Sequence, residues 1–364
     1  MSTMPAEWIL ALTLAAAAAA FVVIWLGIRR ASRRRPGAGP ADPAPTEVLP
    51  DQRVVFILNP VKNGAAEARR QVEAACAAAG WSAPLVLETT PDDPGHGQAK
   101  RALEERADVV IAGGGDGTIR VVASELSGTQ VPMGVLPLGT GNLLARNLGL
   151  EPSALQANIN VALHGVIRKI DTADITLENE ATGMRVEDSF LVIAGIGVDA
   201  DVLADTRDDL KRRFGWVAYS EAGVRHLAGQ RKRVMVSIDG GPAQPRKVRS
   251  ILLANCGKLP AGIDFIPTAE IDDGEIDIVV LSPRSVVGWL WIAAKTLVRH
   301  AAPIPVIEYH RGRTVRITAH DPMGTQLDGD PSGPVTSLTV EVRPRSLAVR
   351  TEAIPSADSA RPAA

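Results

Sequence analysis

Short apolar runs alternate with helical patterns through the first half of the chain. The apolar runs are rich in β-branched residues, as buried strands are, and they lie at residues 54–58, 85–88, 108–112 and 133–137. The stretches that follow them read as helices, at residues 65–79, 98–106, 119–126 and 142–148. Strands that alternate with helices in this way predict an α/β domain with a parallel sheet, over residues 53–165.

A different pattern begins near residue 166. Short β-rich runs separated by glycine, proline and aspartate dominate, at residues 190–193, 234–238, 251–254, 276–281, 314–317 and 337–342. Two helical stretches interrupt them, at residues 203–227 and 285–300. The pattern predicts a second, mainly antiparallel β-sandwich domain over residues 166–350, followed by a disordered tail at 351–364.

An uncharged apolar run precedes both domains. It extends from Trp8 to Ile28, and five arginines follow it within residues 29–35. A membrane-spanning helix needs about 20 such residues. A signal peptide would begin with basic residues, whereas only Glu7 is charged here. We therefore expect a single transmembrane helix at 8–28 in the cell membrane, with the rest of the chain in the cytoplasm behind a basic, proline-rich linker at 29–52.

Composition excludes several classes of protein. The chain has 364 residues, enough for two domains, and its net charge of −2 gives no whole-chain argument for nucleic-acid binding. Its two cysteines, Cys76 and Cys256, are too few and too far apart for a zinc site or a disulfide framework. We expect no nucleic-acid partner and neither redox nor zinc chemistry.

Glycine-rich loops carry the candidate chemistry. Gly113–Thr118 (GGGDGT) lies between an apolar strand and a helical pattern. Glycines let the backbone approach an anion closely, and the N–H groups of such a turn can hold a phosphate. Leu136–Asn142 (LPLGTGN) follows the next strand, and Asn59–Gly64 (NPVKNG) follows the first. Loops at the carboxyl ends of neighbouring strands predict a ligand site at one edge of the sheet.

These motifs resemble those of the diacylglycerol kinase catalytic-domain family, which includes sphingosine and ceramide kinases and is distantly related to NAD kinases. The resemblance extends over residues 53–350. It rests on six motifs in order: NP (59–60), GGGDGT (113–118), LPLGTGN with LLARNLG (136–149), GIGVDA (195–200), AEIDDGEID (269–277) and QLDGDP (326–331).

The resemblance implies a kinase that uses ATP and Mg²⁺. The implied ATP-binding residues are Asn59, Pro60, Val61, Lys62, Thr90, Gly114, Gly115, Asp116, Gly117, Thr118, Gly139, Thr140 and Asn142. Thr89 is the alternative to Thr90 after the second strand. The DDG segment is similar to one that binds a structural magnesium, with Asp273 as side-chain ligand and Glu270 and Glu275 offering backbone carbonyls.

The last motif of the family is usually Asp-Gly-Glu and supplies the catalytic base. This chain has Asp328-Gly329-Asp330, so Asp330 is the implied base with a shorter side chain, and Asp328 is the next carboxylate to consider. Arg120-Val121 is a second departure, because bacterial members often show Asn-Glu there. The alternative for each Asp-Gly pair is an ordinary turn.

The residue types also suit phosphoryl transfer independently of the resemblance. Asp116 beside a phosphate loop would repel a nucleotide unless Mg²⁺ lay between them, and we expect it to be an exposed loop residue. A carboxylate such as Asp330 can deprotonate an alcohol as a general base.

The expected acceptor is a membrane lipid, diacylglycerol, which would give phosphatidic acid. Three alternatives stay open: a sphingoid base or other long-chain alcohol as acceptor, a catalytically silent lipid- or nucleotide-binding module, and an NAD kinase-like enzyme. The expected membrane anchor disfavours the last of these, because a soluble acceptor gives no reason for a tether. A homodimer is also left open.

Overall fold

A computed structural model describes residues 51–197, 231–259, 263–264, 266, 268–283, 288 and 306–353. The expected membrane helix at 8–28, nearly all of the linker and the expected helices at 203–227 and 285–300 lie outside the described residues, apart from Gly288. Among the helices that the structure describes, none is long and apolar enough to cross a membrane.

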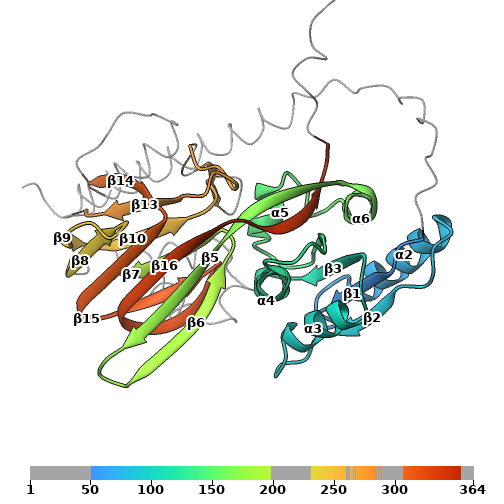
Figure 1. The fold of residues 1–364 in the computed structure, drawn as a ribbon, viewed down its shortest axis with the longest axis horizontal. Coiled ribbons are helices and arrows are strands. Elements are labelled where there is room, and N and C mark those ends of the chain that lie inside the picture. The colour runs from blue at the N-terminus through green and yellow to red at the C-terminus, as the bar shows by residue number, and fades with distance from the viewer. Residues whose placement is uncertain are drawn as a thin grey trace, which may run out of the picture. The chain divides into compact units, whose positions relative to one another are not determined.

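The first part of the fold is a parallel sheet, as the sequence predicted (Figure 1). Its strands are β1 (Val54–Leu58), β2 (Leu85–Glu88), β3 (Val109–Gly114) and β4 (Met133–Pro137), in the order β4-β3-β1-β2. Three of these strands have the predicted bounds. The third begins one residue later than predicted and ends two residues later, at Gly114. The later end arises because Gly113 and Gly114 pair with Leu136 and Pro137 of β4.

Helices cover both faces of this sheet. They are α2 (Ala65–Ala78), α3 (His96–Glu104), α4 (Asp116–Leu126), α5 (Leu143–Asn147) and α6 (Leu155–His164). Alternate residues of a strand point to opposite faces. Accordingly Phe56 packs in a cluster with residues of α2 and α6, whereas Ile57 packs in one with residues of α3, α4 and α5. Helix α6 was not predicted from the sequence.

The second part is mainly antiparallel, again as predicted. Its first strands are β5 (Val166–Asn179), β6 (Met184–Phe190), β7 (Ile193–Gly197), β8 (Lys232–Ile238), β9 (Gln244–Val248) and β10 (Ser250–Ala254). They are followed by β13 (Ile276–Leu281), β14 (Ile307–Gly312), β15 (Thr314–Leu327) and β16 (Asp330–Thr351), with a two-stranded ribbon of β11 (Lys258–Leu259) and β12 (Ile263–Asp264). Their inward residues form a separate apolar cluster.

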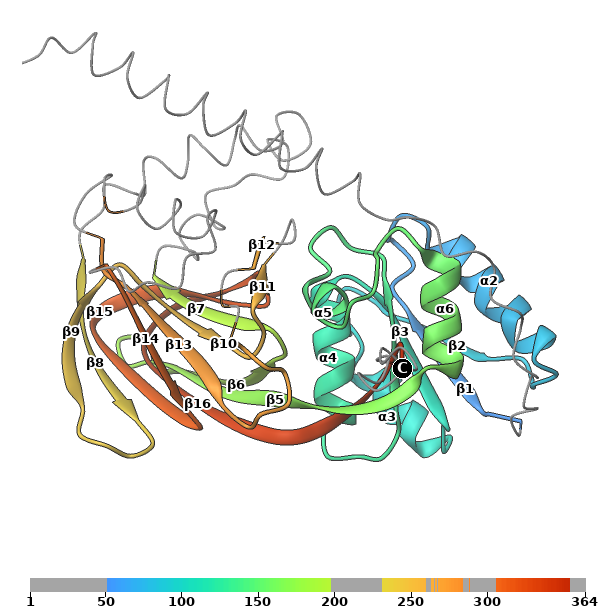
Figure 2. The same cartoon turned by 90° about the horizontal axis from the view of Figure 1, so that it is seen from above.

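Two long strands join the two parts. β5 and β16 pair from Ser337–Glu178 to Thr351–Val166 and run from the antiparallel part to the helix-covered sheet (Figure 2). Val349 of β16 also pairs with Met133 of β4. The hairpin that begins β16 is therefore continuous with a strand anchored in the core of the first part.

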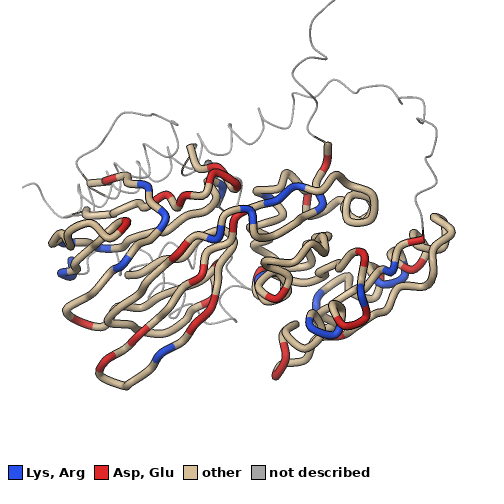
Figure 3. Tube along the Cα trace, in the orientation of Figure 1, with Lys and Arg blue, Asp and Glu red and all other residues tan. Residues whose placement is uncertain are grey.

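Charged residues of both signs are interspersed along both parts of the described chain (Figure 3). This distribution agrees with the near-zero net charge.

Candidate active site

The loops after β1 and β3 are in direct contact. The Asn59 amide nitrogen donates to the Thr118 hydroxyl at 3.3 Å, and the Asn59 backbone N–H donates to the Gly113 carbonyl at 2.8 Å. Lys62 lies against Gly115: a β-carbon at Gly115 would be 3.5 Å from the Lys62 Nζ. The NP loop thus places a positive charge at the glycine-rich turn.

The loops after β3 and β4 touch through their backbones. A β-carbon at Gly139 would lie 2.7 Å from the Cα of Gly115, so a side chain there would collide with backbone. Leu138 donates its N–H to the Gly114 carbonyl at 2.8 Å. Glycine is needed at Gly139 because the two loops approach this closely.

Asp116 holds these two loops together. Its carboxylate accepts the backbone N–H groups of Asn142 at 2.8 Å and Leu143 at 2.5 Å, at the start of α5. The sequence-based expectation of an exposed loop residue was wrong: Asp116 is the first residue of α4 and is only partly exposed. Burial raises the pKa of Asp116, and the nearby Asp330 charge adds to that effect, although the two N–H groups oppose it.

Asn142 closes the second glycine-rich loop. Its backbone is left-handed, with φ of 50°, a conformation that asparagine tolerates better than most residues. The buried amide accepts the N–H of Gly139 at 3.0 Å and donates to the Gly139 carbonyl at 2.8 Å. Asn142 therefore shapes the loop, and its amide is already occupied by these two bonds.

A cleft of about 640 Å³ opens beside these loops. It is lined by Val61, Lys62, Asn63, Gly64, Pro137, Leu138, Gly139, Thr140, Asn142, Arg146, Pro152, Ser153, Leu155 and Asn158. Five of the expected ATP-binding residues are in that lining. Thr90 is not: its hydroxyl accepts the N–H of Asp93 at 3.1 Å, in the turn after β2.

Four polar residues of the cleft were not among the expected ATP-binding residues: Asn63, Arg146, Ser153 and Asn158. The signal for Arg146 was available, because it lies within the LLARNLG segment. Its Nε donates to the Gly141 carbonyl at 2.9 Å, which ties the guanidinium to the second loop. Asn158 lies on α6, which was not predicted from the sequence.

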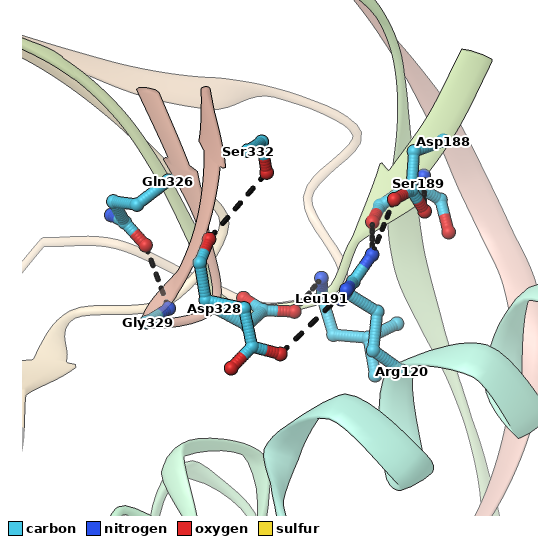
Figure 4. Close-up of polar contacts among 9 residues, drawn as sticks. Arg120, Asp188, Ser189, Leu191, Gln326, Asp328, Gly329 and Ser332 are labelled. Carbon is cyan, nitrogen blue, oxygen red and sulfur yellow. Dashed lines mark hydrogen bonds and ion pairs between the residues drawn. The ribbon is translucent and has the colours of Figure 1, made fainter. Parts of the chain in front are cut away.

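A tight hairpin between β15 and β16 presents the candidate base. Its two turn residues, Asp328 and Gly329, have φ of 48° and 93°. Positive φ at both positions is typical of the type I′ turn that suits a twisted two-residue hairpin. Gly329 donates its N–H to the Gln326 side chain at 2.6 Å, and the turn is drawn in Figure 4.

Asp328 anchors this turn from inside the protein. It is buried, and its carboxylate accepts the N–H groups of Leu191, Val192 and Ile193, each at 2.9 Å. Burial raises the pKa of Asp328 to about 6, although the three N–H groups oppose the rise. The hydrogen bonds that its carboxylate accepts all come from backbone groups, so it fixes the turn, and its catalytic role stays a prediction.

Asp330, in contrast, is half-exposed and faces the glycine-rich loop Gly113–Thr118. A β-carbon at Gly117 would lie 2.8 Å from its Oδ2 atom, so the carboxylate lies over the first turn of α4. The Nη2 atom of Arg120, one turn along the same helix, is 3.7 Å from that oxygen. The fold thus brings together two candidate groups, Asp330 and Asp116, that are 214 positions apart in the sequence.

The acidic turn at 272–277 lies elsewhere, at β13. Asp273 accepts the N–H of Glu275 at 3.0 Å with one oxygen and pairs with the Arg311 guanidinium through the other. Arg311 also lies 3.5 Å from the Glu275 carboxylate and 3.3 Å from that of Asp277.

The side chains of this turn are paired with a guanidinium as the turn is arranged. Within the described ranges, no group of three or more acidic, His or Cys side chains is placed to hold a metal ion. Arg311 already supplies the positive charge, and both oxygens of Asp273 are used. Glu270 is exposed beside the turn. The magnesium role of Asp273, Glu270 and Glu275 stays a prediction.

Comparisons with known proteins identify the family and the fold. Residues 53–175 match the family model described as "Diacylglycerol kinase catalytic domain", and residues 192–351 match "YegS C-terminal NAD kinase beta sandwich-like domain". A Pseudomonas fluorescens protein named "Probable lipid kinase YegS-like" is 31% identical over 304 residues, which is 80% of this chain and 91% of that protein. A Bacillus subtilis "Diacylglycerol kinase" is 26% identical over 258 residues, 70% of this chain and 81% of that protein.

A solved structure shares the fold. The crystal structure of a diacylglycerol kinase from Bacillus anthracis superposes with a TM-score of 0.65 at 20% identity, and covers 84% of this chain and 98% of that one. At that identity the likeness shows the fold alone. The two domain matches and the 31% identical relative go further, and confirm the resemblance drawn from the motifs: the chain belongs to the diacylglycerol kinase catalytic-domain family, together with the YegS-like lipid kinases.

Proposed function

We propose that this protein transfers the γ-phosphate of ATP to the hydroxyl of diacylglycerol and forms phosphatidic acid. Membership of a lipid kinase family supports the reaction class. The observation that carries the proposal is the position of Asp330, whose carboxylate lies against Gly117 in the phosphate loop. A base at that place is next to the phosphate group that would be transferred.

The converging loops suit a nucleoside triphosphate. Backbone N–H groups at the start of α4 favour an anion, because they have no partner within the helix and the helix dipole is positive there. The Lys62 ammonium group beside Gly115 adds a full positive charge. The 640 Å³ cleft beside these groups is in the size range of small-molecule sites.

The reaction needs a base and little other covalent chemistry. Asp330 accepts the proton of the lipid hydroxyl while the hydroxyl oxygen forms a bond to the γ-phosphorus. The bond between that phosphorus and the β,γ-bridging oxygen breaks, and ADP leaves with the electron pair. Mg²⁺ arrives with ATP as part of the substrate and neutralises phosphate charge. Asp116 is the carboxylate proposed to face that complex, while it also keeps the two loops in register.

The proposed acceptor is embedded in a membrane. The apolar run at 8–28, followed by five arginines, supports a single-pass anchor that would keep the kinase at its substrate. Fractionation of cells tests this part separately: full-length protein should sediment with membranes and be released by detergent. Its recovery in the soluble fraction without detergent would contradict the anchor.

The reaction itself is tested by incubating purified protein with γ-labelled ATP, Mg²⁺ and a panel of acceptors in detergent micelles. The label should appear in phosphatidic acid. Label in a sphingoid base or another long-chain alcohol would keep the kinase and change the acceptor. Label in NADP would make it an NAD kinase-like enzyme, and no labelled product from any acceptor would leave a silent binding module.

A further inference from the structure

Arg120 stands where the family resemblance implies an asparagine. It lies on α4, one turn after the phosphate loop, and is only 9% exposed. A buried guanidinium is costly unless carboxylates or other acceptors surround it. Its partners therefore indicate what it does.

Three carboxylates provide that environment. The Nη1 atom of Arg120 donates to Asp188 of β6 at 2.6 Å and to the Ser189 carbonyl at 3.4 Å (Figure 4). Its Nη2 atom is 3.7 Å from the Oδ2 atom of Asp330. Burial alone would lower the pKa of Arg120, but the charges of Asp188, Asp328 and Asp330 more than offset this, and its pKa is raised. Arg120 therefore stays charged.

The two departures from the family pattern are thus in contact. Asp330 is one methylene shorter than the usual glutamate, and Arg120 is longer and positively charged where asparagine is usual. We propose that Arg120 is a positioning residue, which holds the Asp330 carboxylate over the first turn of α4 and offsets its charge beside the bound phosphates. This inference rests on the proposed function.

A purely structural role is the rival explanation. Arg120 ties α4 to β6 through its hydrogen bond to Asp188. Its third nitrogen, Nε, has no hydrogen-bond partner in the part of the chain that the structure describes. Loss of Arg120 would then lower stability and leave the kinetics of the folded enzyme unchanged. Asp188→Asn is the matched control, because it removes the negative charge of the structural contact and leaves the guanidinium beside Asp330.

The first test is kinetic, on the full chain in lipid–detergent micelles. Arg120→Asn should lower kcat by at least about tenfold, as a displaced catalytic group does, and Asp188→Asn by less than about threefold. Asp330→Glu alone should also lower kcat, whereas Arg120→Asn combined with Asp330→Glu restores the family pair and should recover much of the loss. Equal losses of kcat in Arg120→Asn and Asp188→Asn would overturn the inference. So would a double variant, Arg120→Asn with Asp330→Glu, in which the two single losses of kcat simply multiply.

The second test needs no catalysis. Calorimetry should show that Arg120→Asn weakens binding of Mg²⁺–ATP by roughly fivefold, because the Asp330 charge then repels the phosphates, and that Arg120→Asn with Asp330→Asn restores it. If the wild type binds ATP and Arg120→Asn does not weaken binding, only this inference fails. If the wild type does not bind ATP at all, the proposed function fails and the inference fails with it.

Discussion

The Oδ2 atom of Asp330 lies where a side chain at Gly117 would have to fit, 2.8 Å from the position of a β-carbon there. Gly117→Ala should therefore push the carboxylate away from the phosphate loop. Because the obstacle is the end of a half-exposed side chain, the fold should tolerate the change, and alanine is favoured over glycine within a helix.

We expect kcat of Gly117→Ala to fall by at least about tenfold while the free energy of unfolding stays within about 1 kcal/mol of the wild type. Steady-state kinetics and urea unfolding measure the two quantities. A variant with wild-type kcat would show that the contact between Asp330 and Gly117 has no part in the reaction.

Asp116→Ala tests the link between the two glycine-rich loops. Removing the carboxylate leaves the N–H groups of Asn142 and Leu143 without their acceptor, which should cost about 1–3 kcal/mol of unfolding free energy. Activity should be lost as well. Asp116→Asn keeps one acceptor oxygen and is the matched variant: it should regain part of the stability but little of the activity if the charge faces Mg²⁺–ATP. Full activity in Asp116→Asn would show that the reaction does not need the negative charge of Asp116.

The pH dependence of stability tests Asp328. Its pKa is about 6 in the folded protein and close to 3.9 in the unfolded chain, so between these values the folded state holds the proton more tightly. The contribution of Asp328 to the free energy of unfolding is therefore greatest below about pH 4 and is lost as the pH rises through 6. Between pH 7 and pH 5 the wild type should gain about 1 kcal/mol relative to Asp328→Asn in urea unfolding. An equal change in both proteins would mean that Asp328 does not titrate in this range.

Chelation tests the acidic turn. Since Arg311 already pairs with Asp273, Glu275 and Asp277, EDTA should leave the wild-type Tm unchanged. Arg311→Ala should lower the free energy of unfolding by about 1 kcal/mol. Millimolar Mg²⁺ should restore part of that loss, because the carboxylates of the turn are then no longer paired with Arg311. Arg313→Ala is the neighbouring control. A wild-type Tm that falls in EDTA would instead support the magnesium site that the resemblance implied.

Local patterns predicted most of the first part of the fold. The strand at 54–58 was clear because all five of its residues are apolar and buried, and the glycine-rich loops identified the candidate site through their composition and their places after successive strands. The second part was harder. The predicted strand at 190–193 joins the end of β6 to the start of β7, and the break between them exists because Leu191 and Val192 donate to Asp328, far along the chain.

Long-range contacts also explain what was missed at the site. Nothing local to Arg120 reveals that it meets Asp188 and Asp330, 68 and 210 positions away. Asp116 looked like an exposed loop residue because its partners, Asn142 and Leu143, belong to another loop. The sequence indicated which residue types were present, and pairing across the hairpin and the sheet determined which of them act on one another.

The central claim, that Asp330 is the base of a lipid kinase, is tested most directly by transfer of the labelled γ-phosphate of ATP to diacylglycerol. We predict that Asp330→Asn lowers kcat by roughly 10²–10⁴, the usual contribution of a positioned base, while the protein stays folded and still binds Mg²⁺–ATP. We expect no substitution by Asp328, because its carboxylate is buried against three N–H groups. Phosphatidic acid formed by Asp330→Asn at the wild-type rate, or none formed by the wild type, would contradict the claim.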